Sequence, residues 1–151
     1  MTSVVVACEE SAPVLAVDIG GTKFEVGLVD SYGRILDSRR AATTGVDGEA
    51  LFEELIGIVD PLLALGPVVG IGVGCGGPMT GGGLLVSPLN IGQWRDFPLA
   101  ARLAERTGAA VEVDNDAKAL ALSEGWCGAA VGEGNYLAMV VSTGVGGGVV
   151  L

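Results

Sequence analysis

Histidine is absent from this chain of 151 residues, and its absence excludes two classes of site. Neither a Ser-His-Asp nor a Cys-His catalytic arrangement can be built, and no metal ion can have an imidazole ligand. Cysteine is scarce: Cys8, Cys75 and Cys127 are far apart without CxxC spacing, which indicates neither a disulfide framework nor a zinc knuckle. This cysteine usage is typical of a reducing compartment, so we expect a cytoplasmic protein.

Positive charge is also scarce. Eight Lys and Arg residues stand against 18 Asp and Glu residues, which gives a net charge of −10. A nucleic-acid partner requires a basic face, so this composition disfavours nucleic-acid binding. No apolar run approaches the roughly 20 residues of a membrane span, and we expect no membrane partner. An anionic cofactor would have to be held by backbone N–H groups, helix ends or a metal ion.

Apolar periodicity predicts an α/β fold with a mixed sheet. A short apolar run predicts a buried strand at 14–17, and alternating apolar residues predict a second strand at 23–30. After a turn, residues 35–40 can continue them as a third strand, so the three form an antiparallel meander. Apolar residues spaced three and four apart then predict a helix that Asp47 caps and Gly66 ends. The remaining elements are a strand at 67–74, a helix at 98–107, a strand at 109–113, a helix that starts at Asn115 or Asp116, and a strand on each side of a glycine-rich loop at 142–148.

The segment DIGGTK joins the first two predicted strands and has the composition of a phosphate-binding turn. It lacks the spacing of a P-loop, and no helix follows it as the dinucleotide fingerprint requires. Gly20 and Gly21 would let backbone N–H groups approach an anion, while Thr22 adds a hydroxyl donor. Lys23 would add charge, and Asp18 could hold Mg²⁺ through water. The alternative is a plain hairpin turn in which Asp18 bonds its own backbone.

A second cluster, STGVGGG at 142–148, also lies between two apolar segments. Two such loops could face each other across a cleft and hold one polyphosphate. The alternative is a pair of unrelated hairpins.

Five blocks of the chain, in this order and spacing, resemble the N-terminal half of a ROK-family sugar kinase. The blocks are DIGGTK at 18–23, GIGVGCGGP at 70–78, PLNIGQW at 88–94, VDNDAKALALSEG at 113–125 and STGVGGG at 142–148. The family lies within the actin, Hsp70 and hexokinase-like superfamily. The resemblance therefore implies a ribonuclease H-like or actin-like ATPase domain, with three antiparallel strands first and helices on the flanks.

The resemblance implies ATP-dependent phosphorylation of a hexose or amino-hexose, with ATP and Mg²⁺ as cofactors. Asp116 matches the catalytic base, although it could also only cap the following helix. The positions implied to face the sugar are Gly77, Pro78, Asn90, Asn115 and Asp116, where either asparagine could instead simply close a turn. The positions implied to surround the phosphates are Gly20, Gly21, Thr22, Lys23, Thr143, Gly144, Gly146 and Gly147, and Asp18 is implied to support the metal ion.

Some positions depart from the family pattern and leave the sugar open. Lys118 stands where many relatives have asparagine, and GCGGPMT replaces the usual loop beneath the sugar. Glucose, N-acetylmannosamine and fructose all remain candidates, as do ATP and polyphosphate as donors. Trp94 and Trp126 could stack on a sugar, but we expect both to pack in the core.

The resemblance also implies a domain organisation. We expect a flexible N-terminus at 1–12, the small α/β domain at 13–116 and the start of a second, larger domain at 117–151. Family members continue for about as long again and usually carry a zinc-binding Cys/His cluster there, so the chain alone is expected to be inactive. The last apolar strand is expected to pair with another chain in a homodimer.

Two other functions are open. A sugar-responsive ROK regulator would carry a winged helix-turn-helix ahead of DIGGT, and the 17 residues before Asp18 leave no room for one. A non-catalytic sugar- or nucleotide-binding module is the second alternative.

Overall fold

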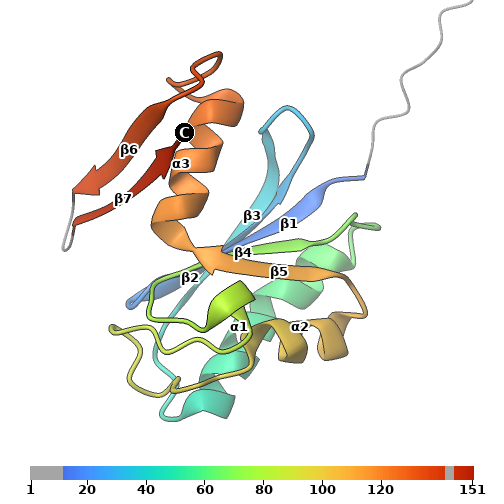
Figure 1. Cartoon of the computed structure of the whole chain (residues 1–151). Coiled ribbons are helices and arrows are strands. Elements are labelled where there is room, and N and C mark those ends of the chain that lie inside the picture. Colours follow the sequence, from blue (N-terminus) through green and yellow to red (C-terminus); the bar gives the residue numbers. More distant parts are fainter. Residues whose placement is uncertain (1–11, 142–144) are drawn as a thin grey trace, which may run out of the picture.

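The computed structural model describes residues 12–141 and 145–151, which form a five-stranded sheet, a two-stranded sheet and three α-helices (Figure 1). The strands are β1 (Val14–Ile19), β2 (Lys23–Val29), β3 (Ile35–Ala42), β4 (Ile71–Cys75), β5 (Val111–Asn115), β6 (Tyr136–Val141) and β7 (Val145–Val150). The helices are α1 (Gly48–Leu63), α2 (Leu99–Thr107) and α3 (Asp116–Cys127), with a short 3-10 turn at Gly81–Gly83. None of these described helices has the length and apolar character needed to cross a membrane.

The larger sheet is mixed, in the strand order β3-β2-β1-β4-β5. β1 pairs antiparallel with β2, and β2 with β3, so the predicted antiparallel meander is confirmed. β4 runs parallel to β1, and β5 parallel to β4, with Ile19, Cys75 and Asn115 in one row of the register. The carboxyl ends of three parallel strands therefore meet at one edge of the sheet.

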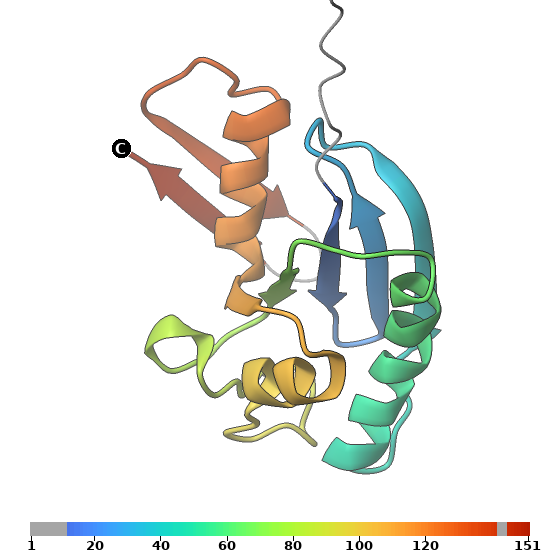
Figure 2. The same cartoon turned by 90° about the vertical axis from the view of Figure 1, so that its right-hand side faces the viewer.

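Helices α1 and α2 cover one face of the larger sheet, while α3 lies on the other side together with the β6–β7 ribbon (Figure 1, Figure 2). Alternation along β1 buries Leu15, Val17 and Ile19 in the core that α1 and α2 complete. Ala16 and Asp18 lie on the opposite face. Asp18 therefore lies on the sheet face away from α1 and α2, close to the edge where the parallel strands end.

Trp94 lies at the centre of the core. Its ring stacks on Phe24, with centroids 5.7 Å apart, and on Phe97, with centroids 4.8 Å apart. Its side chain is fully buried, which confirms the predicted core position. The same prediction is wrong for Trp126, whose side chain is 54% exposed, because the last turn of α3 extends beyond the core.

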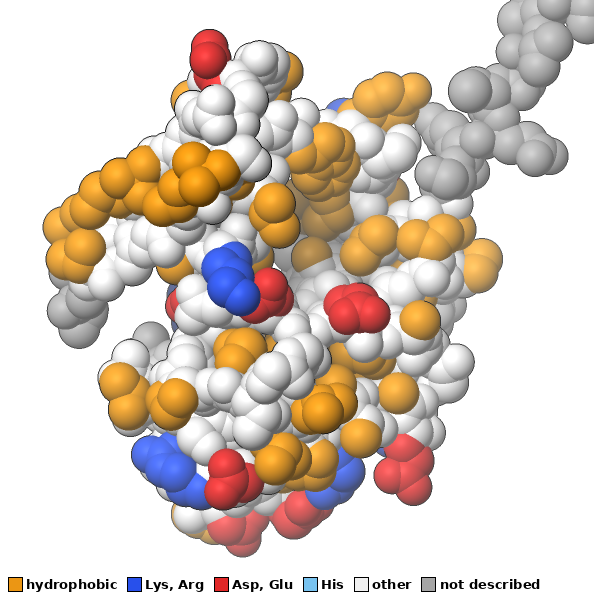
Figure 3. Space-filling view, viewed as in Figure 1, with side chains coloured by type: hydrophobic (Ala, Val, Ile, Leu, Met, Phe, Trp, Pro, Cys, Tyr) orange, Lys and Arg blue, Asp and Glu red, His pale blue; other side chains and the backbone are white. Residues whose placement is uncertain are grey.

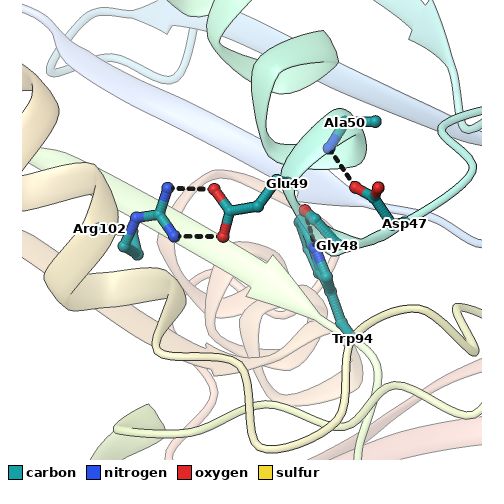
Figure 4. Close-up of polar contacts among 6 residues, drawn as sticks. All are labelled: Asp47, Gly48, Glu49, Ala50, Trp94 and Arg102. Atoms are coloured by element: carbon teal, nitrogen blue, oxygen red, sulfur yellow. Dashed lines mark hydrogen bonds and ion pairs between the residues drawn. The ribbon is translucent and has the colours of Figure 1, made fainter.

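The start of α1 is fixed by polar contacts (Figure 4). The Oδ1 atom of Asp47 accepts a hydrogen bond from the backbone N–H of Ala50 at 2.8 Å, which confirms the predicted N-cap. Glu49 accepts two hydrogen bonds from the guanidinium of Arg102 on α2, each 2.6 Å long. Such a bidentate pair orients both groups, so it holds the two helices in register.

Helix α3 is held at two places. On one side β7 packs against it so closely that a Cβ added to Gly148 would lie 2.5 Å from the Cβ of Ala121. At its C-terminal end, the position of a Cβ on Gly33 would lie 2.8 Å from the Sγ of Cys127. The turn between β2 and β3 therefore contacts the last residue of α3.

Several element boundaries differ from the predicted ones, and two of these differences have a plain physical cause. The strand predicted from residue 67 begins at Ile71, because the chain pairs with both β1 and β5 only from that residue. Helix α1 ends at Leu63 and not at Gly66. The N–H groups of Leu65 and Gly66 donate to carbonyls three residues earlier, which tightens the turn after the helix.

Candidate functional site

The candidate site lies where the three parallel strands end. The DIGGTK turn follows β1, the Gly77 loop follows β4, and Asp116 follows β5 directly. In open α/β sheets, ligands bind outside the carboxyl ends of the strands. The register of β1, β4 and β5 thus brings the residues that follow these strands together, although they lie far apart along the chain.

The Gly77 loop is joined to the segment that carries Asn90. The carbonyl of Gly77 accepts a hydrogen bond from the N–H of Leu89 at 3.2 Å, and the carbonyl of Pro78 accepts one from Ser87 at 2.9 Å. The amide nitrogen of Asn115 lies 3.9 Å from the place of a Cβ on Gly77. Four of the positions implied to face the sugar are therefore neighbours.

Asn90 in turn lies against the DIGGTK turn. A Cβ added to Gly21 would lie 2.5 Å from the Cβ of Asn90, a distance that no real pair of such atoms shows. Only glycine at position 21 allows this approach. The residues implied for sugar and those implied for phosphate therefore adjoin each other.

Backbone donors of the DIGGTK turn are left open. The N–H of Gly20 donates to the carbonyl of Lys23 at 3.0 Å and closes the turn. Within the described ranges, the N–H groups of Gly21 and Thr22 donate to no protein acceptor, and Asp18 bonds no backbone group of the turn. The Nζ of Lys23 is 3.2 Å from Glu25 in an exposed ion pair. The turn can accordingly offer donors to an anion.

Asp116 is the first residue of α3, and its two oxygens are in different surroundings. Its Oδ1 accepts a hydrogen bond from the N–H of Ala117 at 2.8 Å, and the Asn115 side chain accepts a second from the same group at 3.1 Å. Its Oδ2 faces Gly76, 3.9 Å from the place of a Cβ there. The capping contact therefore leaves one carboxylate oxygen available for chemistry.

The surroundings of Asp18 raise the pKa of its carboxyl group. Partial loss of solvent, followed by the carboxylates of Asp116 and Glu25, raises the pKa of Asp18 above its usual value of 3.8. Burial, with the same two aspartates nearby, raises the pKa of the Cys75 thiol to about 12. Cys75 is therefore protonated at neutral pH and is no nucleophile, whereas a cation beside Asp18 would relieve the repulsion there.

A hollow of about 760 Å³ adjoins the site between α3 and the sheet face opposite α1 and α2 (Figure 3). Small residues of β1 and β4 form part of its lining, together with the carboxylates of Asp18 and Asp116. Its lining within the described residues does not include Gly21, Gly77 or Asn90. The candidate site therefore lies where the hollow meets the sheet edge, since Asp18 and Asp116 line the hollow and the glycine turns adjoin it at the edge.

The second glycine cluster differs from its prediction. The predicted loop at 142–148 is too long, since β7 begins at Val145 and pairs Gly146 and Gly147 with β6. A Cβ on Gly146 would lie 3.2 Å from the Cβ of Ala117, so packing against α3 explains this glycine. Thr143 and Gly144 lie outside the described residues, and the proposed facing of two loops stays a prediction.

Replacing Asp18 with asparagine should raise the melting temperature at neutral pH and leave it unchanged well below pH 3.8. A raised folded-state pKa means that ionisation of Asp18 destabilises the fold as pH rises through that pKa. The neutral amide removes this penalty, whereas at low pH both folded and unfolded states are protonated. Thermal unfolding across a pH series measures the difference.

Asp37→Asn is the matched control for this prediction. Hydrogen bonds from Arg39 and from the N–H of Ser38 lower the pKa of Asp37, so its substitution should act in the opposite direction at neutral pH. A melting temperature that Asp18→Asn lowers at neutral pH would contradict the electrostatic account.

Comparison with known proteins agrees with this geometry. Residues 14–151 match the model of the family described as the ROK family. The chain belongs to the ROK family. Its predicted α/β fold of the actin-like ATPase type is thereby confirmed, and the match includes every strand and helix of the structure.

Relatives within the ROK family include sugar kinases. The chain is 39% identical over 143 residues to a glucokinase of Halalkalibacterium halodurans, covering 90% of this chain and 43% of the relative. The structure of a ROK family glucokinase from Streptomyces griseus in complex with glucose and AMPPNP has 34% identity and a TM-score of 0.83, over 92% of this chain and 44% of that one. The chain thus spans less than half the length of these relatives.

A ROK family transcriptional regulator also shares the fold, with a TM-score of 0.82 over 92% of this chain and 36% of that one. Its identity of 20% shows the fold alone.

Sequence reasoning missed two supporting residues of this ROK site. The Thr43 hydroxyl donates to the carbonyl of Gly20 at 3.0 Å, and the Gln93 amide donates to the carbonyl of Gly45 at 3.1 Å. Both contacts join segments distant in sequence, so no local pattern marks them. The threonine pair at 43–44, shortly after the third predicted strand, was the available signal.

Proposed function

We propose that this chain forms the N-terminal half of an ATP-dependent kinase that phosphorylates a hexose hydroxyl. The observation that carries the proposal is the convergence of Gly21, Asn90, Asn115 and Asp116 at one sheet edge of a ROK-family fold. Glucokinases among the relatives support the substrate class, and glucose is the first sugar to test.

Asp116 would act as the general base. Its Oδ2 accepts the proton of the attacking sugar hydroxyl as the new O–P bond forms and the bond from the γ-phosphorus to the bridging oxygen of ADP breaks. The Oδ1 contact with the N–H of Ala117 keeps the carboxylate oriented during this step. Asn90, Asn115 and the backbone of Gly77 and Pro78 would bind the sugar hydroxyls, since an amide both donates and accepts.

The DIGGTK turn would hold phosphate through the open N–H groups of Gly21 and Thr22, with Lys23 adding charge. Thr143, Gly144, Gly146 and Gly147 are proposed to contact the same phosphates. Asp18 suits Mg²⁺, which takes one or two carboxylates, waters and substrate phosphates as ligands. When bound, the ion neutralises charge on the phosphoryl group.

We further propose the division into a small domain at 13–116 and the beginning of a larger domain at 117–151. The separate sheets support this division, because β1 to β5 form one sheet and β6 with β7 another. A cytoplasmic homodimer is part of the same proposal, as is a structural zinc site in the remainder of the kinase. Within the described part of the chain, no group of three metal-ligating side chains is found.

A sugar-responsive regulator has less support. The regulator among the structural neighbours shares only the fold, and the net charge of −10 disfavours contact with DNA.

The test is a coupled assay of ADP release by the full-length protein with ATP, Mg²⁺ and a panel of hexoses. We expect turnover of about 1–100 s⁻¹ on at least one hexose, its loss on chelation of Mg²⁺, and no turnover by the 151-residue chain alone. Absence of sugar phosphorylation with both ATP and polyphosphate as donors would overturn the proposal.

A further inference from the structure

We propose that Thr43 is a positioning residue that orients the DIGGTK turn toward phosphate; the inference rests on the function proposed above. Thr43 follows the last residue of β3 and lies half-buried beside the turn. It contributes no charge and occupies none of the positions that the family resemblance assigns. Its role is inferred from two hydrogen bonds to the turn.

Both bonds go to carbonyl groups of the turn. The Thr43 hydroxyl donates to the carbonyl of Gly20 at 3.0 Å, and the Thr43 N–H donates to the carbonyl of Thr22 at 3.1 Å. In a planar trans peptide, the N–H points away from the carbonyl of the same unit. Fixing the carbonyl of Gly20 therefore turns the N–H of Gly21, one of the two proposed phosphate donors, to the side away from Thr43, and fixing the carbonyl of Thr22 does the same for the N–H of Lys23.

Thr43 can fix the turn because its own segment is anchored to α1. The carboxylate of Glu54 accepts hydrogen bonds from the N–H and hydroxyl of Thr44, at 3.1 and 2.6 Å, and from the N–H of Gly45 at 3.1 Å. Glu54 lies on a helix whose apolar face is in the core. The turn is thus braced by the core and not only by its own closing bond.

The same segment also reaches the loop that carries Asn90. The side chain of Gln93 donates to the carbonyl of Gly45 at 3.1 Å, and Asn90 of that loop lies against Gly21. One anchored segment therefore sets the relative position of the phosphate turn and the sugar-facing loop. Loss of the Thr43 hydroxyl would release the first carbonyl of the turn while the other supports stay in place.

The experiment compares Thr43→Val, Thr43→Ser and Thr107→Val in the full-length protein. Thr43→Val should raise the KM for ATP about tenfold, as expected for loss of one oriented hydrogen bond, with little change in the KM for sugar. Thr43→Ser retains the hydroxyl and should restore the wild-type KM. Thr107→Val is the matched control, because it removes a half-buried threonine hydroxyl that donates to a backbone carbonyl, that of Leu103 at 2.7 Å, within α2 and not at the turn.

The readouts separate positioning from stability. Thr107→Val should lower the melting temperature and leave the KM for ATP unchanged, whereas Thr43→Val should change KM in excess of any change in melting temperature. An unchanged KM in Thr43→Val, or an equal increase in both valine variants, would overturn the role of Thr43. A wild-type protein that phosphorylates no sugar would instead refute the proposed function itself.

Discussion

Asp116→Asn should lower kcat on the preferred hexose by a factor of about 10² to 10⁴, the usual contribution of a positioned general base. The amide keeps an oxygen that can accept from the N–H of Ala117, as Oδ1 of Asp116 does at 2.8 Å, and the N-cap residue Asn115 is unchanged, so the helix start should be retained. It cannot accept a proton at neutral pH. The KM for the sugar should therefore change little, and steady-state kinetics with thermal unfolding would separate catalysis from folding.

Asp114→Asn is the control for this substitution. Asp114 is an exposed aspartate two residues earlier, paired with Lys118 at 2.9 Å, and such surface pairs contribute at most about 1 kcal/mol. This variant should retain nearly full kcat. Comparable kcat values for Asp116→Asn and the wild type would show that Asp116 only caps the helix.

Trp94→Ala should destabilise the protein by about 3–5 kcal/mol, as expected for truncation of a large buried aromatic residue. The substitution removes the ring stacked between Phe24 and Phe97 and leaves a cavity in the core. It also removes the hydrogen bond from Nε1 of Trp94 to the carbonyl of Gly48 at 3.0 Å (Figure 4). This bond joins the segment that carries Trp94 to the start of α1. Urea denaturation followed by far-UV circular dichroism measures the loss.

Two variants make the prediction about Trp94 specific. Trp94→Phe retains a stacking ring but not the N–H donor, so its loss should be smaller than that of the alanine variant. Trp126→Ala removes the same side chain from a position that is 54% exposed, and such surface changes usually stay within about 0.5 kcal/mol. Equal losses for the alanine variants at 94 and 126 would contradict the core assignment.

Features that depend on local chemistry were predictable from the sequence. Asp47 and Asn115 cap helices through contacts with residues two or three positions away, and the alternation of Phe24, Val26 and Leu28 along β2 follows from neighbouring residues. The order of the parallel strands needed the structure, because it depends on pairing between β1, β4 and β5, which are far apart in the chain.

The glycine cluster near the C-terminus shows why local reading failed there. A run of glycines is typical of a loop, but Gly146 and Gly148 lie in a strand that packs on Ala117 and Ala121 of α3. Because these two glycines have no side chain, β7 can pack closely against α3. Thr43 was missed for the same reason, because the carbonyl that it contacts lies 23 positions earlier.

The contact between Gly33 and Cys127 at the far end of α3 offers a natural position for a reporter. Cys127 is exposed, whereas Cys75 is buried and stays protonated, so a nitroxide label would react at the former once Cys8 is replaced by serine. The mobility of the label, read from its spectrum, would increase if the β2–β3 turn and α3 separate when nucleotide and sugar are added. An unchanged mobility would show that α3 stays in contact with the larger sheet when ligands bind.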